Sequence, residues 1–173
     1  MQNLVSKKEE EERRLKALAE YRILGTKPES CYDDITKIAA TTCNVPISLM
    51  TLVDKDKQWF KSKIGLQISE TRRDWSFCTH AIKENSPLII HDAFQDERFI
   101  NNPLVTGDPK IRFYAGFPLK NSDGNKLGTL CVIDRKPGNL TTQQFNIMEL
   151  LSKQIVSFLE LRKKSLNLLD AVS

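Results

Sequence analysis

Cys78 and His80 are the two residues of this chain whose types and spacing most suggest catalysis. An imidazole beside a thiol can take its proton and activate it as a nucleophile. The two residues are only two positions apart, however, and on a helix such residues point in different directions. Cys78 also shares an apolar helical face with Ala81 and Ile82. We therefore predict that Cys78 is a buried core thiol that reacts slowly with thiol reagents.

The other cysteines and histidines do not form a metal-binding pattern. The chain has four cysteines and two histidines, and no two cysteines have the Cys-x-x-Cys spacing of a metal site. We expect no metal site, and free thiols rather than a disulfide at Cys31, Cys43, Cys78 and Cys131. Free thiols of this kind suit a reducing cytoplasm.

Charged residues flank a long irregular segment at residues 92–108. In one interpretation Asp92, Arg98 and Arg112 form a polar lip over a pocket, where an arginine clamps a carboxylate or phosphate. In the other, Asp96 caps a helical turn and Arg98 pairs with a nearby acid. Both interpretations remain open from the sequence.

Aromatic residues near this segment could line a pocket for a planar ligand, although aromatics at strand and helix spacing are more often core. His80 could donate a hydrogen bond to a bound anion or ring. The candidate ligand-binding residues are therefore Phe77, Cys78, His80, Asp92, Arg98, Arg112 and Tyr114.

A predicted hairpin must position several of these side chains. Residues 111–119 alternate between apolar and mostly polar positions, as a strand with two unlike faces does. Residues 127–133 are apolar on both faces, which predicts a central strand covered on two sides. Asp123-Gly124 lies between them and suits a hairpin turn, so we expect the two strands to pair antiparallel.

Further elements surround this hairpin. Apolar spacing predicts helices over residues 7–24 and 30–43, a short helix over 75–83, and a long final helix capped by Thr141 or Thr142. Residues 47–53 are expected to form a second central strand, 58–64 an edge strand, and 88–90 a short strand. The irregular residues 92–108 are where a binding pocket is expected.

Composition narrows the function classes. The net charge of +4 is spread along the 173 residues, without the basic and aromatic cluster of a nucleic-acid surface. The N-terminus is charged rather than apolar, and no apolar run is long enough to cross a bilayer. We therefore expect no nucleic-acid partner, no signal peptide, no membrane insertion and a cytoplasmic location.

Five strings, in this order and spacing, resemble the GAF domain family over about residues 15–162. They are Ser76–Ile82, Asp92 with Asp96–Phe99, Asn102–Val105, Ile111–Leu119 and Leu127–Asp134. The resemblance implies an α+β fold: an antiparallel sheet with terminal helices on one face and a pocket covered by loops and a helix on the other. Residues 1–14 are then a charged N-terminal helical extension, and residues 163–173 a C-terminal signalling-helix extension.

The resemblance also implies a regulatory function. GAF domains typically occur in bacterial histidine kinases, diguanylate cyclases and phosphodiesterases, where they bind small molecules or act as dimerising signal modules. We expect a non-catalytic sensory domain of two-component or cyclic-di-GMP signalling, with its output kinase or cyclase module in the same chain or a partner. The sequence does not identify a ligand or cofactor. Bilin attachment is not expected, because Thr79 separates Cys78 from His80 and the Asp-x-Cys-Phe signature is absent.

An enzyme is the alternative function. Free methionine-R-sulfoxide reductases are GAF-like and use cysteine thiols, and this chain has cysteines near the pocket-side helix and on the last strand. The sequence around them does not match that of the reductases.

The final helix carries the strongest sign of self-association. Its apolar stripe continues past Arg162, beyond what a small domain needs to cover its own sheet. A continuing stripe suits a parallel two-helix seam. We expect a homodimer whose seam includes Ile155, Phe158, Leu159, Leu166 and Leu169. The alternative is a helix that packs only on its own sheet and frays after Lys164.

Overall fold

The computed structural model describes residues 2–173, with side chains described from Ser6 onward; Met1, the first residue of the predicted extension 1–14, lies outside the described part. A six-stranded sheet in the order β3-β2-β1-β6-β5-β4 forms its centre, and every neighbouring pair is antiparallel. The strands are β1 (Ile47–Val53), β2 (Lys57–Ile64), β3 (Glu70–Arg72), β4 (Leu88–Ile90), β5 (Phe113–Lys120) and β6 (Lys126–Asp134). The predicted α+β class is confirmed.

Seven helical segments complete the described fold. They are α1 (Gln2–Glu20), α2 (Ser30–Cys43), the 3₁₀ turn η1 (Arg73–Trp75), α3 (Phe77–Ala81), the 3₁₀ turn η2 (Ala93–Gln95), α4 (Pro103–Thr106) and α5 (Thr142–Val172). α1 ends four residues earlier than predicted, and α3 is shorter than the predicted helix over 75–83. Thr141 caps α5: its hydroxyl accepts from the Gln144 backbone N–H, and the Gln144 side chain accepts from the Thr141 N–H.

The predicted hairpin is confirmed. β5 and β6 pair antiparallel, with Ala115 opposite Val132 and Phe117 opposite Leu130. Gly124 has φ 82° in the turn, a backbone conformation that glycine adopts at little cost. The Asn121 side chain closes the turn by accepting from the backbone N–H groups of Asp123 and Asn125.

One strand prediction was wrong. Residues 58–64 do not form an edge, because β3 pairs with the first half of β2 and forms the edge instead. The error came from Lys61 and Lys63, which gave the segment the look of an exposed strand. The Lys61 side chain is in fact completely buried.

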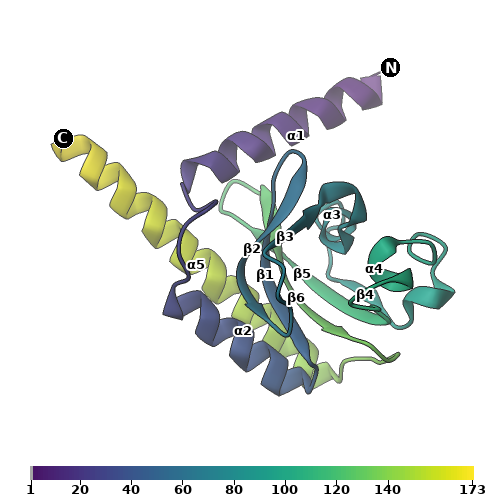
Figure 1. Cartoon of the computed structure of the whole chain (residues 1–173). Helices are drawn as coiled ribbons and strands as arrows, with labels where there is room; N and C mark the ends of the chain where they lie inside the picture. The colour runs from purple at the N-terminus through teal and green to yellow at the C-terminus, as the bar shows by residue number, and fades with distance from the viewer. Residues whose placement is uncertain (1) are drawn as a thin grey trace.

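Long helices cover one face of the sheet. α2 and α5 lie side by side across it, and the second half of α1 packs at its end (Figure 1). The core of this helical face consists of apolar side chains from the three helices and from alternate positions of the strands. Examples are Leu18, Ala39, Phe117, Leu130, Met148, Ile155 and Leu159.

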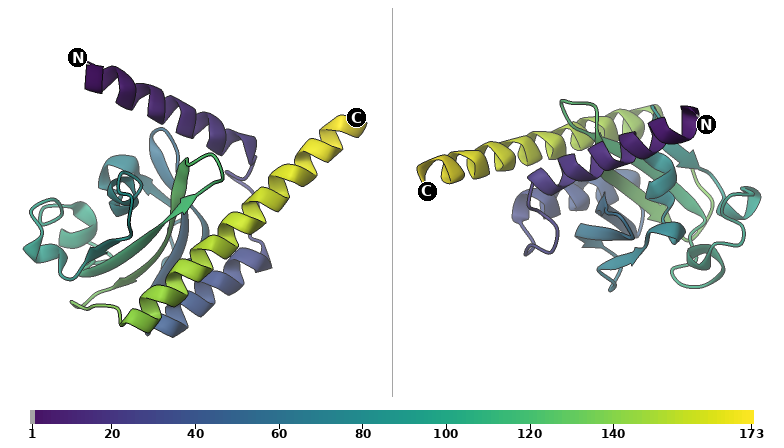
Figure 2. Two further views of the ribbon diagram at one scale, coloured as in Figure 1. Left: turned by 180° about the vertical axis from the view of Figure 1, so that it is seen from behind. Right: turned by 90° about the horizontal axis from the view of Figure 1, so that it is seen from above.

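Short segments cover the other face, which we call the lid face. η1, α3, η2, α4 and the loops between them lie over β1, β6 and β5 (Figure 2). Their apolar side chains form a second core with the alternate strand positions. It includes Leu49, Phe77, Cys78, Phe99, Val105, Tyr114 and Cys131.

α5 continues well past the sheet, and its C-terminal part projects away from the domain (Figure 2). Lys163 and Asp170 of this projecting part pair with Glu20 and Arg22 at 2.6 and 2.5 Å. Neither α1 nor α5 is interrupted at the predicted boundaries after residues 14 and 162. Within the described residues, no helix combines the length and the apolar character that a bilayer crossing requires.

Candidate functional site

A small apolar cavity lies between the sheet and the lid segments. Strand residues such as Leu49, Phe60 and Ile133 form its floor, and Leu104 and Ile111 close it from above. Its volume is about 20 Å³. A space of that size holds roughly one water molecule. A larger ligand therefore requires the lid segments to move away from the sheet.

A polar cluster is buried beneath this cavity and centred on the Cys78 sulfur. The Tyr114 hydroxyl donates to Cys78 Sγ at 3.2 Å, and the Thr129 hydroxyl donates to it at 3.1 Å. Thr51 supports Thr129 from the next strand, with the two hydroxyl oxygens 3.1 Å apart. Cys131 lies two residues after Thr129 on β6, so its side chain points to the same face of the sheet and lines the same cavity as Cys78. All five side chains are buried, and Cys78, Tyr114 and Cys131 line the cavity.

Local backbone geometry makes room for the Tyr114 hydroxyl. Tyr114 and Gly116 point to the same face of β5, since they are two residues apart on a strand. A Cβ atom at position 116 would lie 2.1 Å from the Tyr114 hydroxyl oxygen. The string Tyr114-Ala115-Gly116 therefore lets the phenol lie flat along the strand and reach Cys78.

These contacts change the acidity of both thiols. Burial raises the pKa of Cys78, but the hydrogen bonds from Cys131, Thr129, Thr51 and Tyr114 outweigh it and lower the pKa to about 7. The pKa of Cys131 is raised well above its usual value, by burial first and then by the adjacent Cys78. The cluster thus favours the thiolate at Cys78 and the thiol at Cys131.

Aromatic packing holds α3 over the sheet. Phe77 stacks on Phe99 with ring centroids 4.0 Å apart, and also meets Tyr114 at 5.1 Å. His80 packs edge-on against Phe99 at 4.9 Å, and burial lowers the pKa of its imidazole. Ser76 caps α3 by accepting from the Thr79 backbone N–H. Asn102 ties α4 to this region by donating to the Trp75 carbonyl at 2.9 Å.

The structure separates the candidate ligand-binding residues into two groups. Phe77, Cys78 and Tyr114 are together at or beside the cavity, whereas His80, Asp92, Arg98 and Arg112 are not part of its lining. The charged residues of the second group instead make hydrogen bonds within the lid segments.

Three charged candidates organise the lid backbone. Asp92 caps η2 by accepting from the Phe94 N–H. Asp96 accepts from the Arg98 backbone and holds its guanidinium at 2.7 Å, so the structural interpretation of this pair holds. Arg112 donates to the carbonyl oxygens of Val105 and Ile111 and lies 3.6 Å over the Phe94 ring. These contacts do not form a polar lip over the cavity.

Sequence reasoning missed several cavity residues. Leu49, Cys131 and Ile133 line it from strands that are apolar on both faces, and such strands do not reveal which face holds a pocket. Phe60 lines it from β2, whose lysines gave that segment the look of an edge strand. All four cysteines are free thiols in the structure. Among the described residues, no group of three or more potential ligands is placed to hold a metal ion.

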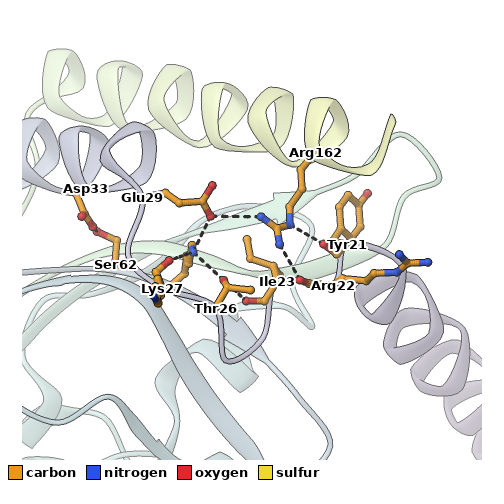
Figure 3. Close-up of polar contacts among 10 residues, drawn as sticks. Tyr21, Arg22, Ile23, Thr26, Lys27, Glu29, Asp33, Ser62 and Arg162 are labelled. Carbon is orange, nitrogen blue, oxygen red and sulfur yellow. Dashed lines mark hydrogen bonds and ion pairs between the residues drawn. The ribbon is translucent and has the colours of Figure 1, made fainter. Parts of the chain in front are cut away.

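A second polar cluster joins the connection between α1 and α2 to the rest of the domain (Figure 3). Arg162 of α5 donates to the carbonyl oxygens of Tyr21 and Arg22 at 2.7 and 2.8 Å, and to Glu29 at 3.3 Å. The Glu29 carboxylate also pairs at 2.7 Å with the buried Lys61 ammonium of β2. One carboxylate therefore bridges the helix α5 and the strand β2.

The five residues of the predicted dimer seam differ in how far the domain covers them. Ile155 and Leu159 are fully buried against the domain, Leu166 is half-buried on the same side of α5, and Phe158 packs edge-on against Tyr32. These residues share a helical face that the domain itself covers. Of the five predicted residues, only Leu169 is exposed.

Comparison with known proteins identifies the family. The sequence profile described as GAF domain matches residues 27–158. A cyclic di-GMP phosphodiesterase of Pseudomonas aeruginosa is 37% identical over 150 residues, which cover 86% of this chain but 26% of that protein. This chain therefore spans about a quarter of that relative's length.

Solved structures show the same fold at low sequence identity. The GAF domain of an Acinetobacter phosphoenolpyruvate-protein phosphotransferase superposes with a TM-score of 0.62 at 14% identity, covering 90% of this chain and 96% of that one. A domain of a putative sensor histidine kinase from Sinorhizobium meliloti gives 0.62 at 15% identity, with 80% and 96% covered. The free methionine-R-sulfoxide reductase of Neisseria meningitidis gives 0.64 at 14% identity, with 84% and 87% covered. At this identity the reductase match shows the fold alone and does not favour the enzyme alternative.

Proposed function

We propose that this chain, which belongs to the GAF domain family, is a non-catalytic sensory domain that passes the state of its lid-face pocket to α5. Domains of this family are generally regulatory. The observation that carries the proposal is the Glu29 bridge, because it joins a strand that lines the cavity to the helix that leaves the domain.

The route from cavity to helix is short. Phe60 lines the cavity from β2, and its neighbour Lys61 points to the opposite face, as successive strand residues do. Lys61 binds Glu29, and Glu29 binds Arg162. A ligand that lifts the lid and shifts β2 would change these contacts. Such a ligand can shift the equilibrium at α5 only by the difference between its binding free energies for the two arrangements.

The pocket fits a small-molecule ligand in chemical character. It is largely apolar, and Tyr114 and Cys78 bring polar atoms to its lining, as in ligand pockets generally. The ligand class remains open between cyclic nucleotides, amino acids, haem and others. The lid consists of short segments, which require less disruption to move than the long helices of the other face.

Dimerisation through α5 is part of the proposal, on a corrected face. Leu161, Leu168 and Val172 are strongly exposed and spaced by seven and four residues, so they form one stripe on the side of α5 turned away from the domain. Leu150 begins this stripe eleven residues earlier. A second copy of the same helix would bury it in a parallel seam.

The output module is proposed to lie in the same polypeptide or in a partner. The Pseudomonas relative is a cyclic di-GMP phosphodiesterase and is much longer than this chain. By analogy we place the domain in the cytoplasm, in front of a cyclic-di-GMP enzyme or a histidine kinase. A regulatory helix such as α5 would join the two.

Hydrogen exchange tests the sensory proposal. Leu104→Phe adds volume where the lid closes the cavity, and so imitates an occupied pocket. We expect faster amide exchange in residues 163–173 and a smaller change when Glu29→Gln is also present. Ile38→Phe, at an exposed position on α2, is the matched control. If Leu104→Phe changed amide exchange in the lid segments but not in residues 163–173, the proposed transmission from the pocket to α5 would be contradicted.

Ligand and turnover assays test the remaining parts. A thermal-shift screen with cyclic AMP, cyclic GMP, cyclic di-GMP, amino acids and haem should give stabilisation by one class, since a ligand of the folded state raises the melting temperature. That stabilisation should weaken in Leu104→Phe. Turnover of free methionine-R-sulfoxide with a thiol reductant would instead establish the enzyme alternative.

Sedimentation tests the dimer. Leu161→Asp with Leu168→Asp would bury charges in the seam and should shift the protein to the monomer while the domain stays folded. Asn167→Asp adds a charge on another side of α5 and should leave the dimer intact. A monomeric parent protein would overturn this part of the proposal.

A further inference from the structure

We propose that Cys78 and Cys131 form a peroxide-oxidisable thiol pair: hydrogen peroxide in the cavity oxidises Cys78, and Cys131 then closes a disulfide that ties α3 to β6. This inference is independent of the proposed ligand sensing, because it rests on the buried cluster and not on the contacts of α5.

The first argument is the convergence of donors on one sulfur. Tyr114 and Thr129 aim their hydroxyls at Cys78 Sγ from 3.2 and 3.1 Å. A neutral thiol is a weak acceptor, whereas a thiolate accepts strongly. Two hydroxyl donors and the Cys131 thiol in an otherwise apolar site therefore suit a thiolate, which is the nucleophilic form.

The second argument is the position of the second thiol. Cys131 lies two residues from Thr129 on the central strand β6, so both side chains point to the face that holds Cys78, and Cys78 and Cys131 line the same cavity. The other two cysteines provide an internal comparison. Cys43 is buried without hydrogen-bond donors, and burial alone raises its pKa to about 11, while burial also raises the pKa of Cys31. Cys78 thus differs from Cys31 and Cys43 in having two hydroxyl donors on its sulfur and a second cysteine in the same cavity lining.

The cavity limits the oxidant to a small one. Both cysteines line it, and its volume is about 20 Å³. That space is near the size of a single water molecule, so hydrogen peroxide is favoured over bulky alkyl hydroperoxides.

The chemistry balances in two steps. The Cys78 thiolate attacks one peroxide oxygen, the O–O bond breaks, and the departing hydroxide takes a proton to become water, which leaves a sulfenic acid. The Cys131 sulfur then attacks Cys78 Sγ and displaces the hydroxyl, which leaves as a second water with the Cys131 proton. Two thiols lose two electrons in total, and one hydrogen peroxide is reduced to two waters.

The product would alter the lid. An S–S bond of about 2.05 Å is shorter than a hydrogen-bonded contact between two sulfurs, so α3 would be drawn onto β6. The oxidised domain should therefore hold its lid closed, and a thiol reductant should release it.

Mass spectrometry of a two-cysteine variant tests the proposal. Cys31→Ser with Cys43→Ser leaves only the proposed pair. After treatment with hydrogen peroxide, unfolding and alkylation, we expect an intact mass lower by two hydrogens and a peptide linking Cys78 to Cys131. Dithiothreitol should restore both alkylatable thiols. Full alkylation of both cysteines after peroxide treatment would overturn the proposal.

Two further variants in this background separate the roles. Cys131→Ser should stop at a sulfenic acid on Cys78, which dimedone traps. Tyr114→Phe keeps the ring and removes one donor, so Cys78 oxidation at pH 7 should slow by about fivefold, which is the effect on the thiolate fraction of raising the pKa by about one unit from about 7. An unchanged rate in Tyr114→Phe, with circular dichroism equal to the parent, would show that the hydroxyl does not activate Cys78.

Discussion

The helical face and the lid face of the sheet are both apolar, but they are covered in different ways. On the helical face, α2 and α5 lay continuous stripes over the strands, and side chains such as Met148 and Ile155 are fully buried. On the lid face the longest helix is α3, with five residues, and individual side-chain hydrogen bonds hold the segments. The lid face also contains a cavity and a buried polar cluster.

This difference indicates which face stabilises the domain and which face can change its conformation. Regular helices close-packed on a sheet leave few ways to relax, so the helical face acts as the scaffold. Short segments beside a cavity can shift at lower cost. The Glu11–Arg73 pair joins α1 to the lid segment η1, and the Glu29 bridge ties α5 to β2, whose Phe60 lies on the lid face. A change on one face would reach the other at these two places.

The largest predicted effect compares the same truncation on both faces. Ile155→Ala should destabilise the domain by about 4 kcal/mol, because the packed helices cannot collapse into the cavity it leaves. Ile111→Ala, equally buried but beside the existing cavity, should cost about 2 kcal/mol, because the lid can settle inward. Urea denaturation measures both. Equal costs would contradict the distinction between the faces.

The next prediction concerns the Glu29 bridge. Glu29→Gln leaves the completely buried Lys61 ammonium without its carboxylate, although the Thr26 hydroxyl and Lys27 carbonyl still accept from it. We expect a loss of about 2 kcal/mol, since an uncompensated buried charge is costly. Lys61→Met, which removes the charge instead, should cost less than 1 kcal/mol, roughly. If urea denaturation showed a larger loss for Lys61→Met than for Glu29→Gln, the Glu29 carboxylate would not be the group that compensates the Lys61 charge.

A smaller, pH-dependent effect is expected at Glu11, which links α1 to η1. Burial raises the pKa of its carboxyl, but the hydrogen bonds and charges of Arg14 and Arg73 outweigh this and lower it from 4.5 to about 2. A lowered folded-state pKa contributes stability above pH 4.5 that is lost as the pH falls toward 2. Glu11→Gln should therefore destabilise by about 1 kcal/mol at pH 7, after allowance for solvent screening. The melting temperatures of the parent protein and Glu11→Gln should converge as the pH falls toward 2. A difference in melting temperature that does not change with pH would contradict the ion pair.

The smallest effect is expected at Arg98 on the lid face. Its pair with Asp96 is local in sequence and the arginine is largely exposed. Arg98→Ala should change the free energy of unfolding by less than about 0.5 kcal/mol, as exposed pairs usually do. The same variant should leave any ligand stabilisation in the thermal-shift screen intact, because Arg98 does not line the cavity. Loss of that stabilisation would restore the predicted polar lip.

The sequence by itself determined the sheet hairpin, the long helices and the family. Period-two and helical spacing specify local structure because they state which face each element must bury, and residues 111–119, 127–133 and 142 onward carry these patterns strongly. The turn at Asp123-Gly124 and the cap at Thr141 followed from local backbone chemistry in the same way. The five strings that resemble the GAF family could be found, in their order, from the sequence alone.

Only the tertiary structure decided which side chains meet. Cys78 and Cys131 are 53 positions apart in sequence, and they line one cavity because α3 packs onto β6. Glu29, Lys61 and Arg162 likewise come from a loop, a strand and a helix. The stripe on α5 shows the limit most clearly: Ile155, Leu159 and Leu166 have the spacing of a dimer seam, yet the domain covers them. Periodicity states that a helical face will be buried, and it does not state against what.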